Sequence, residues 1–400
     1  MQVTTMDAVQ FQTRVVKEGE AFLVVPLTGA PPSRGPAGRS RIFYNSSAAL
    51  SRDISVLALK TYASGKEQSI SIADPLTGCG ARAIRYAREG PERSHVWAND
   101  LNSDVVALAK QAAILNKVEG RVTFSSMDAR VFLTGRAASG ERFDFIDLDP
   151  FGSPAPFLQA AASALRRGGV LALGATDLAT LSGLHPRTCI ARYWARPLKT
   201  EYHHEVAARI LIGFAARTLA GEGLGAHPLS THRLGYVLRV HLQATAGSTT
   251  RNEALSKIGY LYHCFRCLHR ELRPGTLPTS SQECRSCGRP PSVAGPLWIG
   301  PLFDAGFCAK MTESAVQMSL ARPREALSLL AASLAEASAP PTYFIPAVLC
   351  RKWGCPLQPR AELAAKVKNS GYSFVETHLE ATGFRTDAPI DVILDALRAR

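Results

Sequence analysis

The sequence predicts an α/β protein with a doubly wound, mostly parallel sheet, followed by a smaller C-terminal α+β domain that carries a zinc module. From residue 69 onward, short apolar runs alternate with helical segments, and glycine and aspartate follow the first of these runs. Such alternation is typical of parallel strands joined by right-handed crossovers. The composition changes near residue 246, and a chain of 400 residues favours two domains. We therefore predict domains at residues 1–246 and 247–400.

The apolar patterns give bounds for the individual elements. Before the alternation we expect a strand over 20–26, a breaker-rich loop over 28–41 and a helix over 48–62. Strands of the sheet are expected over 69–74, 95–100, 121–126, 143–147, 169–176 and 234–242. Helices are expected over 80–88, 103–115, 155–165 and 206–219. The C-terminal part predicts a long helical stretch over about 312–335 interrupted at Pro323, a helix over 359–369 and a β-wing over 374–388, which together resemble a winged-helix end.

Composition and charge narrow the class of protein. The 46 Lys and Arg residues against 33 Asp and Glu leave a net charge of +13, which fits an anionic polymer as partner, although a merely basic enzyme is the alternative. Nine cysteines, an odd number, argue against a fully paired disulfide framework. No secretory signal and no uninterrupted run of eighteen apolar residues is visible, so we expect a cytoplasmic protein without a membrane span.

Glycine and aspartate residues at the expected strand ends indicate a nucleotide site. Gly78 and Gly80 follow the first strand of the alternation, where glycine lets backbone approach a ligand closely. Asp100 ends the next strand and suits a ribose diol, and Asp128, before Ala129, suits the exocyclic amine of adenine. The same glycines with Asp100 also satisfy the dinucleotide fingerprint, so an NAD-dependent enzyme remains an alternative at this point.

The segment from Asp147 to Pro154, Asp-Leu-Asp-Pro-Phe-Gly-Ser-Pro, distinguishes these alternatives. A strand-to-helix turn accounts for its serine and second proline, but not for Asp149 and Phe151. Methylation of an exocyclic base nitrogen needs an acceptor for the N–H proton and an aromatic ring against the base. Hydride transfer needs neither. We predict that Asp149, rather than Asp147, is the catalytic carboxylate and that Phe151 holds an unstacked base.

Cysteines at 264, 267, 284 and 287 form two Cys-x-x-Cys pairs separated by sixteen residues. Four thiolates at this spacing predict a closed structural Zn²⁺ site with Cys264, Cys267, Cys284 and Cys287 as ligands. Redox-active pairs are the alternative. The basic residues around the pairs favour a basic ribbon, which suits an anionic polymer. By contrast, His203-His204-Glu205 does not place three ligands on one helix face and is predicted to be an ordinary helix start. His185 and Arg187 are further candidates for the base pocket.

The sequence resembles the tRNA (guanine-26-N2)-dimethyltransferase family over nearly its whole length. The resemblance is carried by Thr77-Gly-x-Gly-x-Arg82-Ala-Ile-Arg85, Asn99-Asp100, the segment Asp147–Pro154 and Ala175-Thr-Asp-Leu178. Further matching stretches are Phe43-Tyr44-Asn45, Arg52-Asp53, His185-Pro-Arg187, His204-Glu205-Val206, Gly295-Pro-Leu-Trp298 and Thr377-His378. Ser46, Ser51 and the glycine turn near Cys79 depart from the usual family pattern.

The resemblance implies a Rossmann-like class I methyltransferase that transfers methyl groups from S-adenosylmethionine to the exocyclic N2 of guanosine 26 of tRNA, giving N2-methyl- and N2,N2-dimethylguanosine. Family residues that contact S-adenosylmethionine fall on Arg52, Arg82, Asp100, Asp128 and Ala129, and the catalytic aspartate falls on Asp149, with Phe151 beside the base. The partner would be tRNA, with no obligate protein partner. An NAD-dependent oxidoreductase and a non-catalytic zinc-containing RNA-binding protein remain the alternatives.

Overall fold

The computed structural model describes residues 12–27, 44–278 and 283–398. The loop expected over 28–41 lies entirely outside the described residues. The described chain packs as two compact units. The first contains the described residues of Met1–Pro150, Phe157–Gly174 and Lys310–Leu327, and the second those of Phe151–Pro156, Ala175–Ala309 and Ser328–Arg400.

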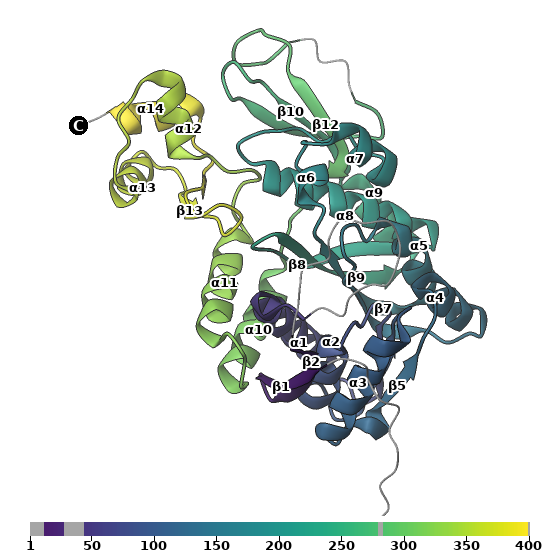
Figure 1. Cartoon of the computed structure of the whole chain (residues 1–400). Helices are drawn as coiled ribbons and strands as arrows, with labels where there is room; N and C mark the ends of the chain where they lie inside the picture. The colour runs from purple at the N-terminus through teal and green to yellow at the C-terminus, as the bar shows by residue number, and fades with distance from the viewer. Residues whose placement is uncertain (1–11, 28–43, 279–282, 399–400) are drawn as a thin grey trace, which may run out of the picture. The chain divides into compact units, whose positions relative to one another are not determined.

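A seven-stranded sheet with the order β5-β4-β3-β6-β7-β9-β8 forms the centre of the fold (Figure 1). Its parallel strands are β3 (Ile70–Asp74), β4 (Ser94–Asn99), β5 (Val122–Ser125), β6 (Phe143–Leu148) and β7 (Leu165–Ala175). All six residues of β6 are buried, as expected for a strand covered on both faces. The chain order runs outward from β3 to one side and from β6 to the other. The carboxyl ends of β3 and β6 therefore form the topological switch point at which such sheets bind ligands.

The helices between these strands follow the predicted alternation closely. They are α1 (Ala49–Ala63), α2 (Ala81–Glu89), α3 (Ser103–Leu115), α4 (Ala129–Ala138) and α5 (Ala155–Ala164). The predicted strands and helices are confirmed to within a few residues, but α4 was not predicted. Ahead of α1, the predicted strand over 20–26 is confirmed as β2 (Ala21–Pro26), which forms a hairpin with an unpredicted strand, β1 (Thr13–Glu18).

The prediction of a single late strand over 234–242 is wrong. The structure has two antiparallel strands, β8 (Leu224–Leu234) and β9 (Val237–Ala246), joined by a turn inside the predicted strand. Gly235 in this turn has φ +62°, in the left-handed region that two-residue hairpin turns require. The alternating apolar pattern continued across this glycine and hid the turn.

The middle of the second unit contains α6 (Leu178–Leu181), α7 (Pro186–Tyr193), α8 (His203–Gly221) and α9 (Ser248–Ser256). It also holds a three-stranded antiparallel sheet of β11 (Arg270–Pro274), β10 (Ile258–His263) and β12 (Ser292–Trp298). The interruption predicted at Pro323 is confirmed, because α10 (Ala305–Gln317) ends before it and α11 (Pro323–Glu336) begins with it.

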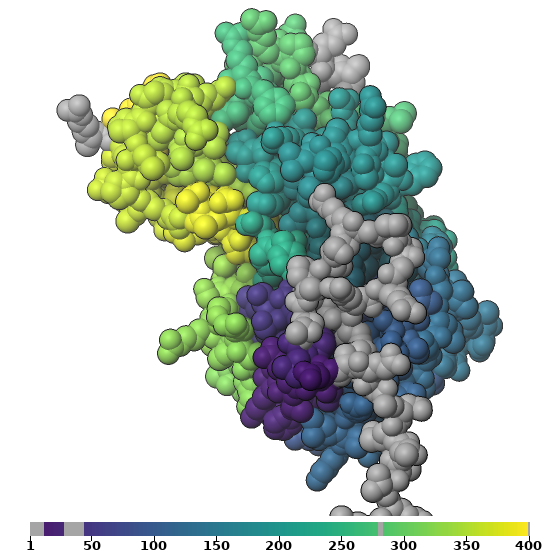
Figure 2. Space-filling model, viewed as in Figure 1, coloured from purple at the N-terminus to yellow at the C-terminus, as the bar shows by residue number. Residues whose placement is uncertain are grey.

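The end of the chain forms a body with its own small core, drawn in yellow and yellow-green in Figure 2. It contains α12 (Pro346–Trp353), α13 (Arg360–Asn369), β13 (Val375–Glu376), β14 (Phe384–Arg385) and α14 (Ile390–Arg398). The predicted helix over 359–369 and the predicted wing are confirmed, the wing as the two short paired strands. Across the described ranges, no helix combines the length and the apolar character needed to cross a bilayer.

Candidate active site

The turn after β3 is shaped by two glycines with different tasks. Gly78 has φ +54° and Gly80, which precedes α2, has φ +80°. A Cβ atom at Gly80 would lie 2.6 Å from the Cβ of Ala109 in α3, so close packing of α2 and α3 requires glycine there. A Cβ atom at Gly78 would meet nothing within 4 Å. The turn is therefore closed on the side of Gly80 and leaves open space at Gly78, where a ligand can approach the backbone.

Asp100 fixes this turn to the end of β4. One carboxylate oxygen accepts a hydrogen bond of 2.9 Å from the backbone N–H of Gly78, and the other accepts one of 3.0 Å from Asn102. Each carboxylate oxygen has two lone pairs, so both retain acceptor capacity for a ligand hydroxyl. The position predicted to bind a ribose is thus held rigidly beside the open side of the turn.

Asp128 lies at the end of the connection after β5 and caps the N-terminus of α4. Its carboxylate accepts hydrogen bonds from the backbone N–H of Arg130 at 2.8 Å and from the Arg130 guanidinium. These bonds, the side-chain one first, lower the pKa of Asp128 to about 2. The carboxylate therefore stays ionised as an acceptor, and the neighbouring Ala129 is buried at the first position of the helix.

Arg82 and Asp149 form the central ion pair of the candidate site. The guanidinium of Arg82 donates two hydrogen bonds to one oxygen of Asp149, at 2.9 and 2.7 Å. It also donates to the hydroxyls of Ser55 and Ser51, at 2.9 and 3.0 Å. The side chain of Arg82 is only 7% exposed, whereas that of Asp149 is 30% exposed. Asp149 is therefore held from within the protein and presents part of its carboxylate outward.

Asp147 has a different environment. Its side chain is fully buried, accepts a hydrogen bond from the hydroxyl of Tyr86 and lies 3.8 Å from the Arg82 guanidinium. The exposures favour Asp149 over Asp147 as a group that can meet a substrate, which is the preference that the sequence predicted. The catalytic role of Asp149 itself remains a prediction.

A third carboxylate, Asp74 at the end of β3, was not among the predicted site residues. It is completely buried and accepts a hydrogen bond of 2.7 Å from the hydroxyl of Thr77. Burial and the nearby charge of Asp147 raise the pKa of Asp74 to about 7. Its place at the carboxyl end of the first parallel strand was the available signal. Ser51 and Ser55 were also missed, although their i, i+4 spacing on α1 puts both on one helix face.

Arg52 lies in a neighbouring ion cluster that is closed. It forms a two-pronged salt bridge to Glu18 of β1, with both contacts at 2.5 Å, and donates to the carbonyl of Asn45 at 2.9 Å. Burial alone would raise the pKa of Glu18, but the bonds from Arg52 and Tyr44 outweigh it and hold that pKa below its usual value. The guanidinium of Arg52 is thus engaged by the protein, and the cofactor contact predicted for it remains a prediction.

The Phe151 loop is held within the second unit. The ring of Phe151 is 72% exposed. Next to it, the backbone of Gly152 exchanges two hydrogen bonds with Thr176, at 2.7 and 2.9 Å. The hydroxyl of Ser153 lies 2.7 Å from that of Tyr193, which donates to Asp177 at 2.8 Å. An exposed aromatic ring is therefore carried on a loop whose following residues are fixed by a hydrogen-bond network.

The four predicted zinc ligands come together. Their Sγ atoms all lie within 4.8 Å of one another, with Cys264 and Cys287 at 3.5 Å and Cys267 and Cys284 at 3.6 Å. Thiolates about 2.3 Å from a tetrahedral Zn²⁺ lie about 3.8 Å apart, so the cluster fits this ion. In each pair, the first cysteine's carbonyl accepts from the backbone N–H four residues later, at Leu268 and Gly288. His203-His204-Glu205 forms the start of α8, as predicted.

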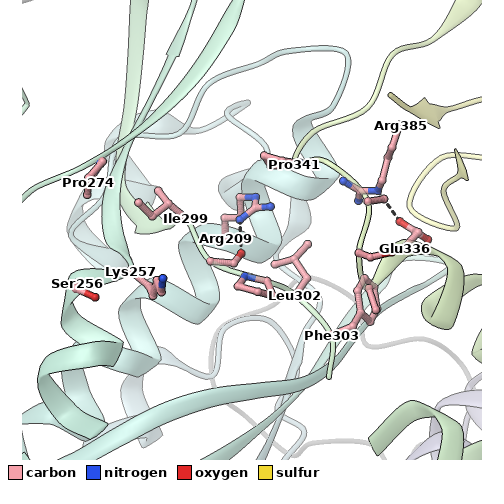
Figure 3. A pocket seen from close by; sticks show the side chains of 15 residues that line it. Arg209, Ser256, Lys257, Pro274, Ile299, Leu302, Phe303, Glu336, Pro341 and Arg385 are labelled. Atoms are coloured by element: carbon pink, nitrogen blue, oxygen red, sulfur yellow. Dashed lines mark hydrogen bonds and ion pairs between the residues drawn. The ribbon is translucent and has the colours of Figure 1, made fainter. Parts of the chain in front are cut away.

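A separate cavity of about 490 Å³ lies elsewhere in the second unit (Figure 3). None of the predicted site residues lines it. Two of its arginines are neutralised by buried carboxylates: Arg209 pairs with Glu205, and Arg385 pairs with both Glu205 and Glu336. These ion pairs join α8, α11 and β14 and account for the charged lining as part of the structure.

The fold and the site define a class of protein. A mostly parallel seven-stranded sheet, a glycine turn after β3 and acidic side chains at successive strand ends are the features of a Rossmann-like methyltransferase. A solved structure of Trm1 from Pyrococcus horikoshii in complex with S-adenosyl-L-methionine superposes with a TM-score of 0.83 at 32% identity, covering 96% of this chain and all of the other.

Sequence comparison identifies the family. A family model described as N2,N2-dimethylguanosine tRNA methyltransferase matches residues 35–398. The tRNA (guanine(26)-N(2))-dimethyltransferase of Methanothermobacter thermautotrophicus is 38% identical over 96% of this chain and 98% of its own length. The tRNA (guanine(26)-N(2)/guanine(27)-N(2))-dimethyltransferase of Aquifex aeolicus is 33% identical over 95% and 94%. The chain belongs to the N2,N2-dimethylguanosine tRNA methyltransferase family.

Proposed function

We propose that this protein transfers methyl groups from S-adenosylmethionine to the exocyclic N2 of guanosine 26 in tRNA, giving N2-methyl- and N2,N2-dimethylguanosine. Family membership and the names of full-length relatives support the substrate. The observation that carries the chemistry is Asp149, a partly exposed carboxylate at the end of β6, paired with the buried Arg82 at the switch point of the sheet.

The residues around the glycine turn fit S-adenosylmethionine. Gly78 leaves open space, Asp100 offers acceptors to a ribose diol, and Asp128 stays ionised to accept from the adenine amine. The sulfonium group of the donor would supply an activated methyl group and is itself a cation. Within the described part of the chain, Asp147 and Asp149 outnumber the guanidinium of Arg82 beside them even without Asp74, whose pKa is about 7, and this negative balance favours a cation.

Asp149 acts on the guanosine amine. The N2 nitrogen bears protons and donates its lone pair to the purine ring, so it is a weak nucleophile. A hydrogen bond from N2–H to Asp149 increases electron density on the nitrogen as the N–C bond forms. The bond from the methyl carbon to the sulfonium sulfur would break at the same time, leaving the donor as a neutral thioether. The N2 proton then passes to the Asp149 carboxylate and on to water. Arg82 holds the carboxylate in place, so that orientation and proximity contribute much of the rate.

The target guanosine must leave its stack to reach a carboxylate at a sheet edge. We propose that Phe151 holds the extruded base, and its exposed ring, on a loop fixed through Thr176 and Tyr193, supports this role. The C-terminal half, residues 247–400, with its basic Cys-x-x-Cys ribbon, is proposed to grip the tRNA. An enzyme acting on tRNA is expected to work in the cytoplasm.

We further propose that Cys264, Cys267, Cys284 and Cys287 hold one structural Zn²⁺. Metal analysis of the purified protein should give about one zinc per chain, because four thiolates fill a tetrahedral site. Cys284→Ser should lower that content, whereas Cys189→Ser, a change at a buried thiol outside the cluster, should leave it unchanged. Equal zinc in both variants would contradict the assignment.

The Asp149→Asn variant tests the catalytic proposal. Asparagine keeps the shape of the side chain but cannot accept the proton, so tRNA methylation should fall by roughly 10²–10⁴-fold. Binding of labelled S-adenosylmethionine should persist. The control is Asp104→Asn, at an exposed carboxylate in the first turn of α3, which should keep the wild-type rate.

The product distinguishes the alternatives. Mass spectrometry of nucleosides from treated tRNA should detect methylated guanosine from the wild type, at position 26. An undiminished rate in Asp149→Asn would refute the role of Asp149, and an inactive wild type would favour an RNA-binding protein without catalysis. Binding of NADH in preference to S-adenosylmethionine would favour an oxidoreductase.

A further inference from the structure

Helix α7, which lies in the second unit (Figure 1), carries exposed apolar side chains. Ile190 is 49% exposed and Trp194, directly after the helix, is 72% exposed, whereas Cys189 and Tyr193 are fully buried. Arg187, Ile190 and Trp194 follow one another at spacings of three and four residues, which places them along one side of a helix. The outer side of α7 is thus an apolar and basic stripe rather than a polar solvent-facing surface.

Trp194 adopts a backbone conformation that favours glycine. It caps the C-terminus of α7 with φ +54° and ψ +35°, and its N–H donates to the carbonyl of Ile190 at 3.0 Å. Helices commonly end in this left-handed conformation, usually with glycine. At this position the aromatic ring buries little apolar surface, and the left-handed backbone is strained for a residue with a side chain. Such outliers concentrate at ligand-binding sites.

The sequence that forms and follows α7 is rich in cations. Between Asp177 and Glu201 the sequence contains no acidic residue but four cations, Arg187, Arg192, Arg196 and Lys199, all of them exposed. Arg192 pairs with Asp177 at 3.2 Å. The other three add exposed positive charge on α7, at Arg187, and on the segment that follows it, at Arg196 and Lys199, and this charge complements a polyanion.

This stripe is joined to the Phe151 loop. The buried hydroxyl of Tyr193 lies 2.7 Å from Ser153, so Trp194 and Phe151 are each within two residues of a single hydrogen bond. Both belong to the same compact unit, and both rings are 72% exposed. A nucleic acid whose extruded base meets Phe151 would pass its neighbouring nucleotides near α7.

We propose that the outer side of α7 is an RNA-docking surface, on which Trp194 stacks against an unpaired base of the tRNA and Arg187, Arg196 and Lys199 bind its phosphates. The inference rests on the proposed function, since it assigns a contact surface for the same substrate. Stacking on an aromatic ring tolerates any base, whereas phosphate contacts add affinity that salt weakens.

The decisive variant is Trp194→Gly. Glycine suits the left-handed backbone, so the variant should fold with a thermal midpoint equal to or above that of the wild type. Loss of the ring should raise KM for tRNA by about tenfold, the range expected for one stacked base, with binding of S-adenosylmethionine unchanged. The matched control is Tyr236→Ala, which removes another exposed aromatic ring, in the β8–β9 turn, and should leave KM unchanged.

Fluorescence gives a second measurement that does not depend on catalysis. Trp194 is the most exposed of the four tryptophans, and stacking on a base quenches indole emission. Added tRNA should quench wild-type fluorescence, and Trp194→Gly should lose that quenching. The double variant Arg187→Ala/Lys199→Ala should reduce the salt dependence of tRNA binding, whereas Lys110→Ala, at an exposed lysine of α3, should not.

The outcomes separate the two proposals. If the wild type methylates tRNA but Trp194→Gly retains both KM and quenching, the docking surface is wrong and the proposed function stands. If the wild type methylates no tRNA and is not quenched by it, both fail. A change of oligomeric state in Trp194→Gly, measured by sedimentation with unchanged tRNA binding, would show that the stripe contacts a second copy and would overturn the RNA assignment.

Discussion

Two arginines one turn apart on α2 show how the same side chain serves two purposes. Arg82 and Arg85 are both buried and both bound to carboxylates. Arg85 contacts Asp53 and Glu89, each at 2.7 Å, and Glu18 at 3.2 Å. Every member of that cluster is at most 6% exposed, Arg52 included. Arg82 instead holds Asp149, which is open to solvent.

The two clusters, one closed and one open to solvent, also differ in their balance of charge. In the closed cluster, Arg52 and Arg85 face three carboxylates, leaving one surplus negative charge. Burial is the largest effect on Glu89 and raises its pKa despite its bonds to Arg85, which agrees with that surplus. In the open cluster, among the residues that the structure describes, Arg82 alone faces Asp147, Asp149 and Asp74, and Asp74 is partly protonated near neutral pH. Surplus negative charge in a closed cluster lowers the stability of the fold. Beside an opening to solvent, the same surplus can interact with a substrate.

The closed cluster also joins distant parts of the first unit. Asp53 accepts hydrogen bonds from the backbone N–H groups of Ala321 and Arg322, at 3.1 and 2.7 Å, and so ties α1 to the segment between α10 and α11. Glu18 brings in β1. The comparison therefore predicts that changes around Arg85 act on folding, and that changes around Arg82 act on catalysis.

The largest effect is expected for Arg85→Met. Methionine retains the apolar stem but leaves buried carboxylates without their cation, which should lower the free energy of unfolding by about 3–5 kcal/mol. Urea denaturation followed by circular dichroism measures this loss. Methylation per folded molecule should remain close to wild type. A variant as stable as the wild type, or one that folds well but is inactive, would remove the distinction between the clusters.

A smaller effect on stability and a larger one on rate are expected for Arg82→Met. Asp149 can turn to solvent when its partner is lost, so the free energy of unfolding should fall by only about 1–2 kcal/mol. The carboxylate would no longer be held for the guanosine amine, and the rate at saturating substrates should fall by roughly 100-fold. Single-turnover methylation and urea denaturation on the same preparation compare the two losses. Equal stability losses in Arg82→Met and Arg85→Met would contradict the comparison.

The sequence predicted which candidate residues lie at the ends of the parallel strands. Gly78, Asp100, Asp128 and Asp149 each follow a strand of a regular alternation, and parallel strands bring their carboxyl ends to one edge. The four cysteines came together because their spacing reports a local structure. For these residues, the strand–helix alternation and the Cys-x-x-Cys spacing were sufficient to predict where they lie.

Partners supplied by distant, weakly patterned segments could not be predicted. The cofactor contact of Arg52 stays a prediction, but its salt bridge to Glu18 was not predicted. Glu18 lies in β1, a six-residue strand with an irregular mixture of exposed and buried positions. The β8–β9 turn was missed because its two sides continue the same alternation. Neither the pairing of Arg82 with Asp149 nor the position of Asp74 beside Asp147 is encoded in a spacing, since each contact joins different strands and helices.

The smallest expected effect concerns Asp74 and its dependence on pH. Its pKa is about 7 in the folded protein, above the value of 3.8 for an unperturbed aspartate. Between these values the folded state binds a proton that the unfolded state has lost, so stability is greatest at low pH and declines as pH rises through 7. Asp74→Asn removes this titration. The stability of the variant relative to wild type should therefore increase by about 3 kcal/mol between pH 4.5 and 8.5.

Asp128 provides the matched control, because it lies at the same sheet edge but has a pKa of about 2. It is ionised in both folded and unfolded states throughout pH 5–8.5, so Asp128→Asn should change stability by the same amount at every pH in that range. Urea denaturation of both variants and the wild type across this range measures the difference. A pH-independent difference for Asp74→Asn would mean that Asp74 is ionised at neutral pH. The open cluster would then carry three negative charges against Arg82, and its contrast with the closed cluster would be greater.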